Sequence, residues 1–85
     1  MNNYDKESLV HHLNGPTIAA LSRFYGISYK QMAARLRCGA SNVKYHIDGD
    51  SFAEWQRMAL LDLFMDYGLE ATELLLIHQL IKTKR

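Results

Sequence analysis

The sequence predicts an all-α fold, a compact bundle of five to six helices in a single domain spanning residues 1–85. A chain of 85 residues has room for one domain only. Its segments are rich in Ala, Leu, Met, Lys and Arg, which favour helices, and show little β-branched alternation. The chain is divided into segments of helical length by its five glycines, Gly15, Gly26, Gly39, Gly49 and Gly68.

Two helices are expected before the middle of the chain. The first, over Tyr4–Leu13, belongs to an extra N-terminal element at residues 1–14. The apolar residues of its inner face are Leu9, Val10 and Leu13. The second begins at Pro16, whose missing N–H costs nothing in a first turn. It ends at Tyr25, because Gly26 can adopt the left-handed conformation that closes a last turn.

Capping residues indicate where the central helices begin. Ser28 and Gln31 have the S-x-x-Q spacing of a capping box, in which side chain and backbone exchange hydrogen bonds. Ser41 is expected to cap the following short helix, which ends at Asp48 and Gly49. Two short helices joined by a tight turn are therefore expected in this part of the chain.

The C-terminal half is expected to form two longer helices. Ser51 and Glu54 suggest a second capping box for a helix over Phe52–Tyr67. The last helix spans about Glu70–Lys82 within a C-terminal element at residues 69–85. One helical stripe is assigned to the core, namely Phe52, Trp55 and Ala59.

The segment between Ile27 and Gly49 has the pattern of a helix-turn-helix unit. The turn is Arg37-Cys38-Gly39. The residues expected to face inward are Met32, Ala33, Leu36, Cys38, Val43 and Ile47. A small residue such as Ala33 permits a close helix crossing, and the apolar positions hold the second helix against the first. In such units the second helix presents its outer face to the DNA major groove.

The stretch Tyr25–Leu36 resembles the start of the phage repressor and Cro (XRE) family, and the spacing continues through the central segment at Gly39, Ser41, Val43, Ile47 and Gly49. The stretch Tyr67–Leu75 resembles the same family's closing motif, in which Gly and an apolar residue precede polar residues and paired leucines. The resemblance covers roughly Thr17–Leu75. It implies a lambda-repressor-like bundle with a central helix-turn-helix at residues 28–48, a DNA-binding role and a phage or bacterial source.

Four residues depart from the family pattern. Tyr29 stands where many members have a Gln that anchors the phosphate backbone, and Arg37 stands at a turn position usually held by Gly. Ala40 opens the recognition helix where a base-reading polar residue is common, and His46 replaces an aliphatic residue. These changes are the reason for keeping a second hypothesis, in which the motif binds a protein.

Charge is distributed unevenly along a chain whose net charge is +1. From Ser8 to Ile47 there is no Asp or Glu. The basic residues of that stretch are Arg23, Lys30, Arg35, Arg37 and Lys44. The acidic residues all lie outside it, so the basic residues concentrate on the segment that would meet phosphate, as counterion release requires.

The outer face of the helix-turn-helix supplies the candidate DNA-binding residues. They are Tyr29, Lys30, Gln31, Arg37, Gly39, Ala40, Ser41, Asn42, Lys44 and Tyr45. Asn42 has the donor and acceptor to pair with adenine, and Lys44 could reach guanine or phosphate. Ala40 or Tyr45 could contact a thymine methyl group. Helix N-termini at Ser28 and Ser41 would add N–H donors for phosphate.

No cofactor, metal site or catalytic group is expected. The histidines and Cys38 lack metal-ligand spacing, and Cys38 is expected to be a small buried hydrophobe. No Ser, His or Asp has the context of a nucleophile, so the chain is not expected to be an enzyme. No apolar run reaches the about 18 residues of a membrane span. The polar stretch Met1–Glu7 is unlike a secretion signal, and we expect a cytoplasmic protein.

The C-terminal half is rich in apolar residues. The stretch Met58–Met65 is apolar nearly all round, and such helices are normally buried. We expect a homodimer through the last helix, with contacts from Leu74, Leu76, Ile77, Leu80 and Ile81. A well-filled monomeric core is the alternative. A two-fold dimer would place its recognition helices about 34 Å apart, one DNA turn, and predicts a palindromic site.

Two functional hypotheses follow. The first is a small sequence-specific transcriptional regulator, repressor-like, that binds double-stranded DNA as a homodimer. The second is a degenerate helix-turn-helix that binds a protein partner, as an antitoxin or repressor modulator does, with little DNA affinity of its own.

Overall fold

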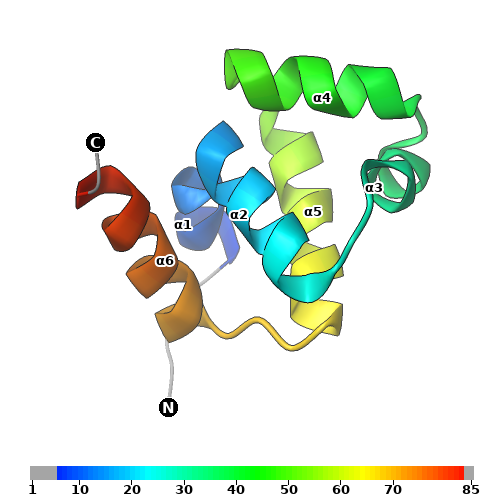
Figure 1. The fold of residues 1–85 in the computed structure, drawn as a ribbon. Coiled ribbons are helices and arrows are strands. Elements are labelled where there is room, and N and C mark those ends of the chain that lie inside the picture. The colour runs from blue at the N-terminus through cyan, green and yellow to red at the C-terminus, as the bar shows by residue number, and fades with distance from the viewer. Residues whose placement is uncertain (1–5, 84–85) are drawn as a thin grey trace.

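The computed structural model describes residues 6–83, and every regular element in that range is a helix (Figure 1). The elements are α1 (Lys6–Leu9), the 3₁₀ turn η1 (Val10–His12), α2 (Gly15–Tyr25), α3 (Tyr29–Leu36), α4 (Ala40–Gly49), α5 (Glu54–Asp66) and α6 (Ala71–Thr83). The all-α prediction is confirmed. The radius of gyration is 12.0 Å, and a single domain of this length is expected to have about 12 Å.

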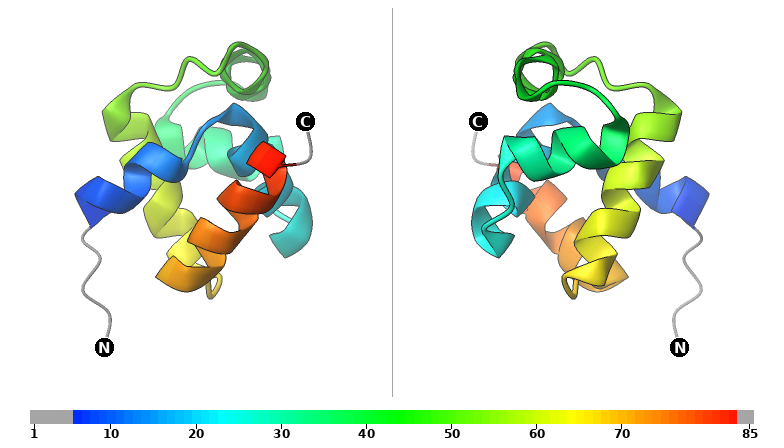
Figure 2. Two further views of the ribbon diagram at one scale, coloured as in Figure 1. Left: turned by 90° about the vertical axis from the view of Figure 1, so that its left-hand side faces the viewer. Right: turned by 90° about the vertical axis from the view of Figure 1, so that its right-hand side faces the viewer.

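Helices α2 and α5 together pack against the other five elements. α2 packs against α4 and α6, and α5 packs against α1, η1 and α3. In Figure 1 and in both views of Figure 2, α4 lies along the top edge of the bundle. α6 lies on the left of Figure 1 and α3 on the right. One long face of α4 is therefore turned away from the rest of the molecule.

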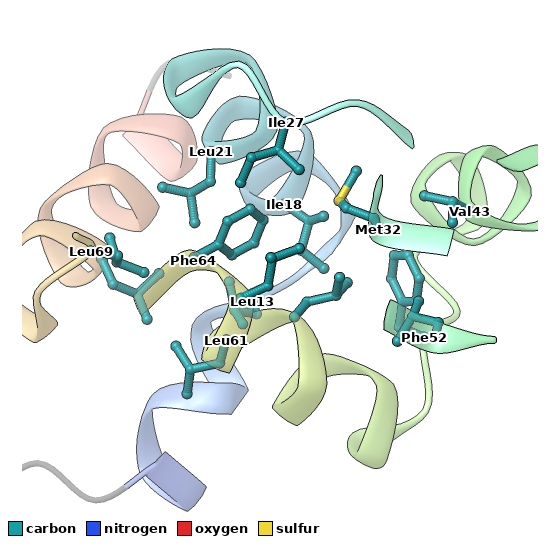
Figure 3. Close-up of a cluster of buried hydrophobic side chains, with 14 of the residues drawn as sticks. Leu13, Ile18, Leu21, Ile27, Met32, Val43, Phe52, Leu61, Phe64 and Leu69 are labelled. Atoms are coloured by element: carbon teal, nitrogen blue, oxygen red, sulfur yellow. The ribbon is translucent and has the colours of Figure 1, made fainter. Parts of the chain in front are cut away.

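One core receives side chains from α1 through α6. Figure 3 shows the part of it formed by residues of α2, α3, α4 and α5 and of the loops between the helices. Phe64 of α5 is fully buried within it, together with Ile18 and Leu21 of α2. Four residues of α5 are buried: Leu60, Leu61, Leu63 and Phe64. The apolar residues of α5 are therefore buried largely inside the monomer. For this helix, the structure agrees with the alternative of a well-filled monomeric core.

The starts and ends of α2 and α3 follow their sequence signals. The Asn14 side chain accepts a hydrogen bond from the Thr17 N–H at 3.0 Å, and Pro16 occupies the first turn. Gly26 ends α2 with a left-handed φ of 69°. The Ser28–Gln31 capping box is present, with bonds of 2.8 and 3.1 Å. The predictions for Pro16, Gly26 and the Ser28–Gln31 box are confirmed because each depends only on neighbouring residues, whereas the Asn14 cap was not predicted.

The N-terminal element is less regular than the sequence predicts. The expected single helix over Tyr4–Leu13 is divided into α1 and η1, and residues 1–5 lie outside the described range. The inner face is nevertheless the predicted one, since its three apolar residues are all buried: Leu9, Val10 and Leu13.

Two predicted N-caps are wrong. Gly39, not Ser41, precedes α4, and Ser41 lies within the first turn. α5 begins at Glu54 after Ala53, whose N–H donates to the Gln56 Oε1 at 2.8 Å. The hydroxyl of Ser51 is instead 2.8 Å from the Nδ1 of His46. The Ser51 pattern failed because its hydroxyl meets a partner five residues earlier, in the last turn of α4.

None of the helices in residues 6–83 is long and apolar enough to cross a membrane.

Candidate nucleic-acid interface

The two sides of α4 differ sharply in exposure. Val43 and Ile47 are buried against the bundle. The five predicted DNA-binding residues of this helix are all exposed: Ala40, Ser41, Asn42, Lys44 and Tyr45. Tyr45 is 70 % exposed, which is high for a large aromatic side chain. The predicted inner and outer faces of α4 are thus both found in the structure.

The turn before α4 holds the two helices close together. In Figure 1, α3 is viewed almost along its axis while α4 runs across the view, so the helices cross steeply. Arg37 ends α3 in the left-handed conformation, with φ of 60°, and its N–H donates to Ala34 O at 3.3 Å. Gly39 is extended and exposed. The inward residues of α3 predicted from sequence are buried, namely Met32, Ala33 and Leu36, and Cys38 packs partly buried against them.

The exposed side chains of α3 do not all lie in one stripe. Gln31 and Arg35 form one stripe, directed toward the end of α5, because Gln31 Nε2 donates to the Tyr67 hydroxyl at 3.1 Å and Arg35 pairs with Asp66 at 3.4 Å. Lys30 lies in the first turn of α3 outside this stripe, and Arg37 is the residue that ends the helix. Both are exposed. The structure therefore separates Gln31 from the other candidate residues.

Tyr29 is the first residue of α3. It is half-buried and packs against the core. The hydrogen bond to Asp48 raises the pKa of the neighbouring Lys44, and the charge of Asp48 raises it further. Lys44 Nζ donates to the Asp48 carboxylate at 2.8 Å, one turn along α4.

The basic residues are not all equally available to a ligand. Arg35 and Lys44 form ion pairs, whereas Arg23, Lys30 and Arg37 form none with any residue in the range 6–83. Asp48 and Asp50 place negative charge at the C-terminal end of α4. The three of these cations that lack an ion pair in the described range thus lie at the end of α2, the start of α3 and the turn before α4, whereas the one lysine of α4 is paired with Asp48.

The far end of α4 contacts the start of α2 directly. The N–H of Gly15 donates to Asp50 Oδ1 at 2.7 Å. A Cβ on Gly15 would lie 2.3 Å from the carbonyl oxygen of Ile47, so the two backbones touch. Sequence reasoning missed this contact, because no local pattern relates residues 35 positions apart.

The predicted dimer residues of α6 fall into three groups. Leu76 and Leu80 are 61 % and 54 % exposed. Ile77 and Ile81 are partly buried. Leu74 is fully buried in the protein's own core, so its assignment to a dimer contact is wrong.

The assignment of Trp55 to the core is also wrong, because its side chain is 61 % exposed.

Among residues 6–83 there is no group of three or more His, Cys, Asp or Glu side chains that could hold a metal ion. His12 and His78 approach each other, with ring centroids 5.0 Å apart, and the Nδ1 of His78 is 3.4 Å from the hydroxyl of the buried Thr17. These contacts connect η1, α6 and α2, and they involve neither α3 nor α4.

No family model, curated protein or solved structure matches this chain. The resemblance to the phage repressor and Cro family therefore stays a prediction from residue spacing.

Proposed function

We propose that this protein is a small, sequence-specific DNA-binding transcriptional regulator, repressor-like, and not an enzyme. The observation that carries the proposal is the division of α4. Its inner face is buried at Val43 and Ile47, while its outer face exposes short polar side chains, a lysine and a tyrosine. A helix fixed in this way can enter a major groove and present side chains to base edges.

The first turn of α4 supplies the base-reading groups in this proposal. Recognition helices contact bases mainly through their N-terminal residues. Asn42 would pair with adenine, Ser41 would bond either base or phosphate, and Ala40 would contact a thymine methyl group. Lys44 would exchange its Asp48 partner for guanine or phosphate. Because Lys44 is exposed and its ion pair is solvated, that exchange costs little.

Phosphate contacts would flank the groove. Lys30 is exposed near the start of α3, and Arg37 is exposed in the turn that leads into α4. The N–H groups at the start of α3 add a positive helix end. Such contacts position the protein and make affinity depend on salt, without reading sequence themselves.

Self-association would proceed through α6. Leu76 and Leu80 lie one turn apart and expose most of their surface. A two-fold pair of these faces would bury them and place two α4 helices on a palindromic site with half-sites about 34 Å apart. The proposal is therefore a homodimer on double-stranded DNA.

Selection from a random duplex pool, followed by fluorescence anisotropy on the selected and a scrambled duplex at two salt concentrations, tests the proposal. We expect preference for the selected duplex and affinity that falls steeply as salt rises. Lys30→Ala should weaken binding to both duplexes and lower the salt slope by about 1. Lys82→Ala on α6 makes the same charge change away from α3 and α4 and serves as the matched control. Equal binding to both duplexes, or equal effects of the two variants, would contradict the proposal.

A second candidate function is a protein-interaction module, such as an antitoxin or repressor modulator. The exposed ring of Tyr45 favours it, together with the Lys44–Asp48 pair, which lowers the positive charge of α4. In that case a Leu76→Ala, Leu80→Ala and Ile81→Ala variant would lose function in cells, whereas Lys30→Ala and Arg37→Ala would keep it.

A further inference from the structure

The contact between the end of α4 and the start of α2 joins two segments far apart in sequence. We call it the α2–α4 junction and define it by Gly15, Ile47 and Asp50. Gly15 donates its N–H to the Asp50 carboxylate at 2.7 Å, and a Cβ on Gly15 would lie 2.3 Å from the Ile47 carbonyl oxygen. No side chain separates the two backbones at this point.

Asp50 has two roles at the junction. Its backbone ends α4 in the left-handed conformation, with φ of 51°, and its N–H donates to the Ile47 carbonyl at 3.3 Å. Its carboxylate accepts from the first residue of α2, where the positive end of the helix dipole favours a negative charge. One residue therefore terminates α4 and attaches it to the start of α2.

The junction and the turn hold α4 at opposite ends. The turn at Arg37–Gly39 fixes the N-terminal end, and α4 is buried between them only at Val43 and Ile47. Without the Asp50 bond, α4 could pivot about those two residues. Ser41 and Asn42 would then shift relative to Lys30 and Arg37. Hydrogen bonds to base edges depend on such placement far more than phosphate contacts do.

We propose that Asp50 is a positioning residue for sequence recognition, which orients α4 through Gly15 rather than by contacting DNA. The inference rests on the proposed DNA-binding function. It predicts that loss of the carboxylate oxygen reduces discrimination between DNA sequences while non-specific binding persists.

Two substitutions separate the hydrogen bond from the charge. Asp50→Asn and Asp50→Gly both remove the negative charge, so both change attraction to phosphate equally. Asn and Gly both tolerate the left-handed conformation that position 50 requires. Only Asn keeps a side-chain oxygen that can accept from the Gly15 N–H. The comparison of these variants with each other isolates the junction bond.

Anisotropy titrations of both variants on the selected and scrambled duplexes measure discrimination. We expect Asp50→Gly to lose about tenfold of the affinity ratio, as for one good base contact, and Asp50→Asn to keep the ratio of the natural protein. Affinity for the scrambled duplex should be the same in both variants. Equal ratios in the two variants, or equal losses on both duplexes for Asp50→Gly, would overturn the inference.

Amide hydrogen exchange on the DNA-free protein provides an independent readout. We expect Asp50→Gly to lower protection in α4 but not in α5, and Asp50→Asn to leave both unchanged. Unchanged α4 protection in Asp50→Gly would show that Asp50 does not hold the helix. If the natural protein does not discriminate between duplexes, the proposed function fails and the recognition role with it, whereas the exchange result still decides whether Asp50 holds α4.

Discussion

Two peripheral helices, α4 and α6, each bury two residues in the shared core. α4 buries Val43 and Ile47, and α6 buries Ala71 and Leu74. Their outward faces differ in chemistry, because α4 exposes mainly polar side chains whereas α6 exposes Leu76 and Leu80. Polar side chains remain solvated in isolation and can exchange water for base edges. Exposed leucines gain only from a second apolar surface, so the two helices are suited to different partners.

The two helices are also attached differently. α4 is held at both ends, by the turn after α3 and by the α2–α4 junction, and by Val43 and Ile47 on its inner face. α6 is held along its side against α2, where His78 meets Thr17 and Glu73 meets Tyr25. Burial raises the pKa of Tyr25, and the charges of Glu73 and Glu70 raise it further. A helix fixed at its ends leaves its whole outer face available for reading a surface.

The largest expected effect is on the free energy of unfolding, and it comes from comparing a buried and an exposed leucine of α6. Leu74→Ala should lower the free energy of unfolding by about 2–5 kcal/mol, because it leaves a cavity in the core. Leu76→Ala should change it by less than about 0.5 kcal/mol in dilute protein, since its side chain is exposed. Urea denaturation of both variants measures the difference. Sedimentation should show that only Leu76→Ala weakens self-association while the fold is kept, and equal destabilisation by both would contradict the assignment of faces.

The α2–α4 junction gives the next effect. Gly15→Ala places a Cβ against the Ile47 carbonyl and should destabilise the fold by about 1–3 kcal/mol. Gly49→Ala on α4 is the matched control, because its Cβ would meet only Ser51 Oγ at 3.6 Å. Alanine is the better helix former, so this control should stabilise by about 0.5–1 kcal/mol. Thermal unfolding measures both, and a neutral Gly15→Ala would mean that α4 is not in close contact there.

The contrast between these helices also shows what the sequence could predict. The helical fold, the α3 cap and the inner face of α4 were predicted because they depend on local pattern. Leu74 and Leu76 are two residues apart and equally apolar, so only the packing of α6 could assign one to the core. The capping pattern at Ser51 was misleading, because its hydroxyl bonds to His46 instead. The Gly15–Asp50 contact has no local signal at all.

Arg37 offers a smaller effect in which stability and binding move in opposite directions. Its left-handed conformation is unfavourable for a side chain with a Cβ, so Arg37→Gly should stabilise the fold by about 1 kcal/mol. The same change removes a proposed phosphate contact and should lower the salt slope of DNA binding by about 1. Denaturation and anisotropy measure the two effects on one variant. Tighter DNA binding by the stabilised variant would remove Arg37 from the interface.

The smallest effect is expected in how the stability depends on pH, through His12, which packs against His78 of α6. Burial lowers the pKa of His12 from its ordinary value of 6.5, and the charges of His78, His11 and Lys82 lower it further. The unfolded chain therefore binds protons more readily than the folded protein as pH falls below about 6.5. The contribution of His12 to the free energy of unfolding is therefore fully present above about pH 6.5. It is lost as the pH falls from there through the lowered pKa of the folded protein.

Because His12 packs against His78, acidification should loosen α6 before α4. Melting temperatures and amide exchange at pH 7.5 and 5.5, with His12→Gln compared to His11→Gln on the exposed neighbour, measure the effect. His12→Gln should reduce the difference between the two pH values more than His11→Gln does. A greater loss of protection in α4 than in α6 at low pH would mean that the two helices are not attached as the contacts indicate, since α4 lies outside this group of imidazoles.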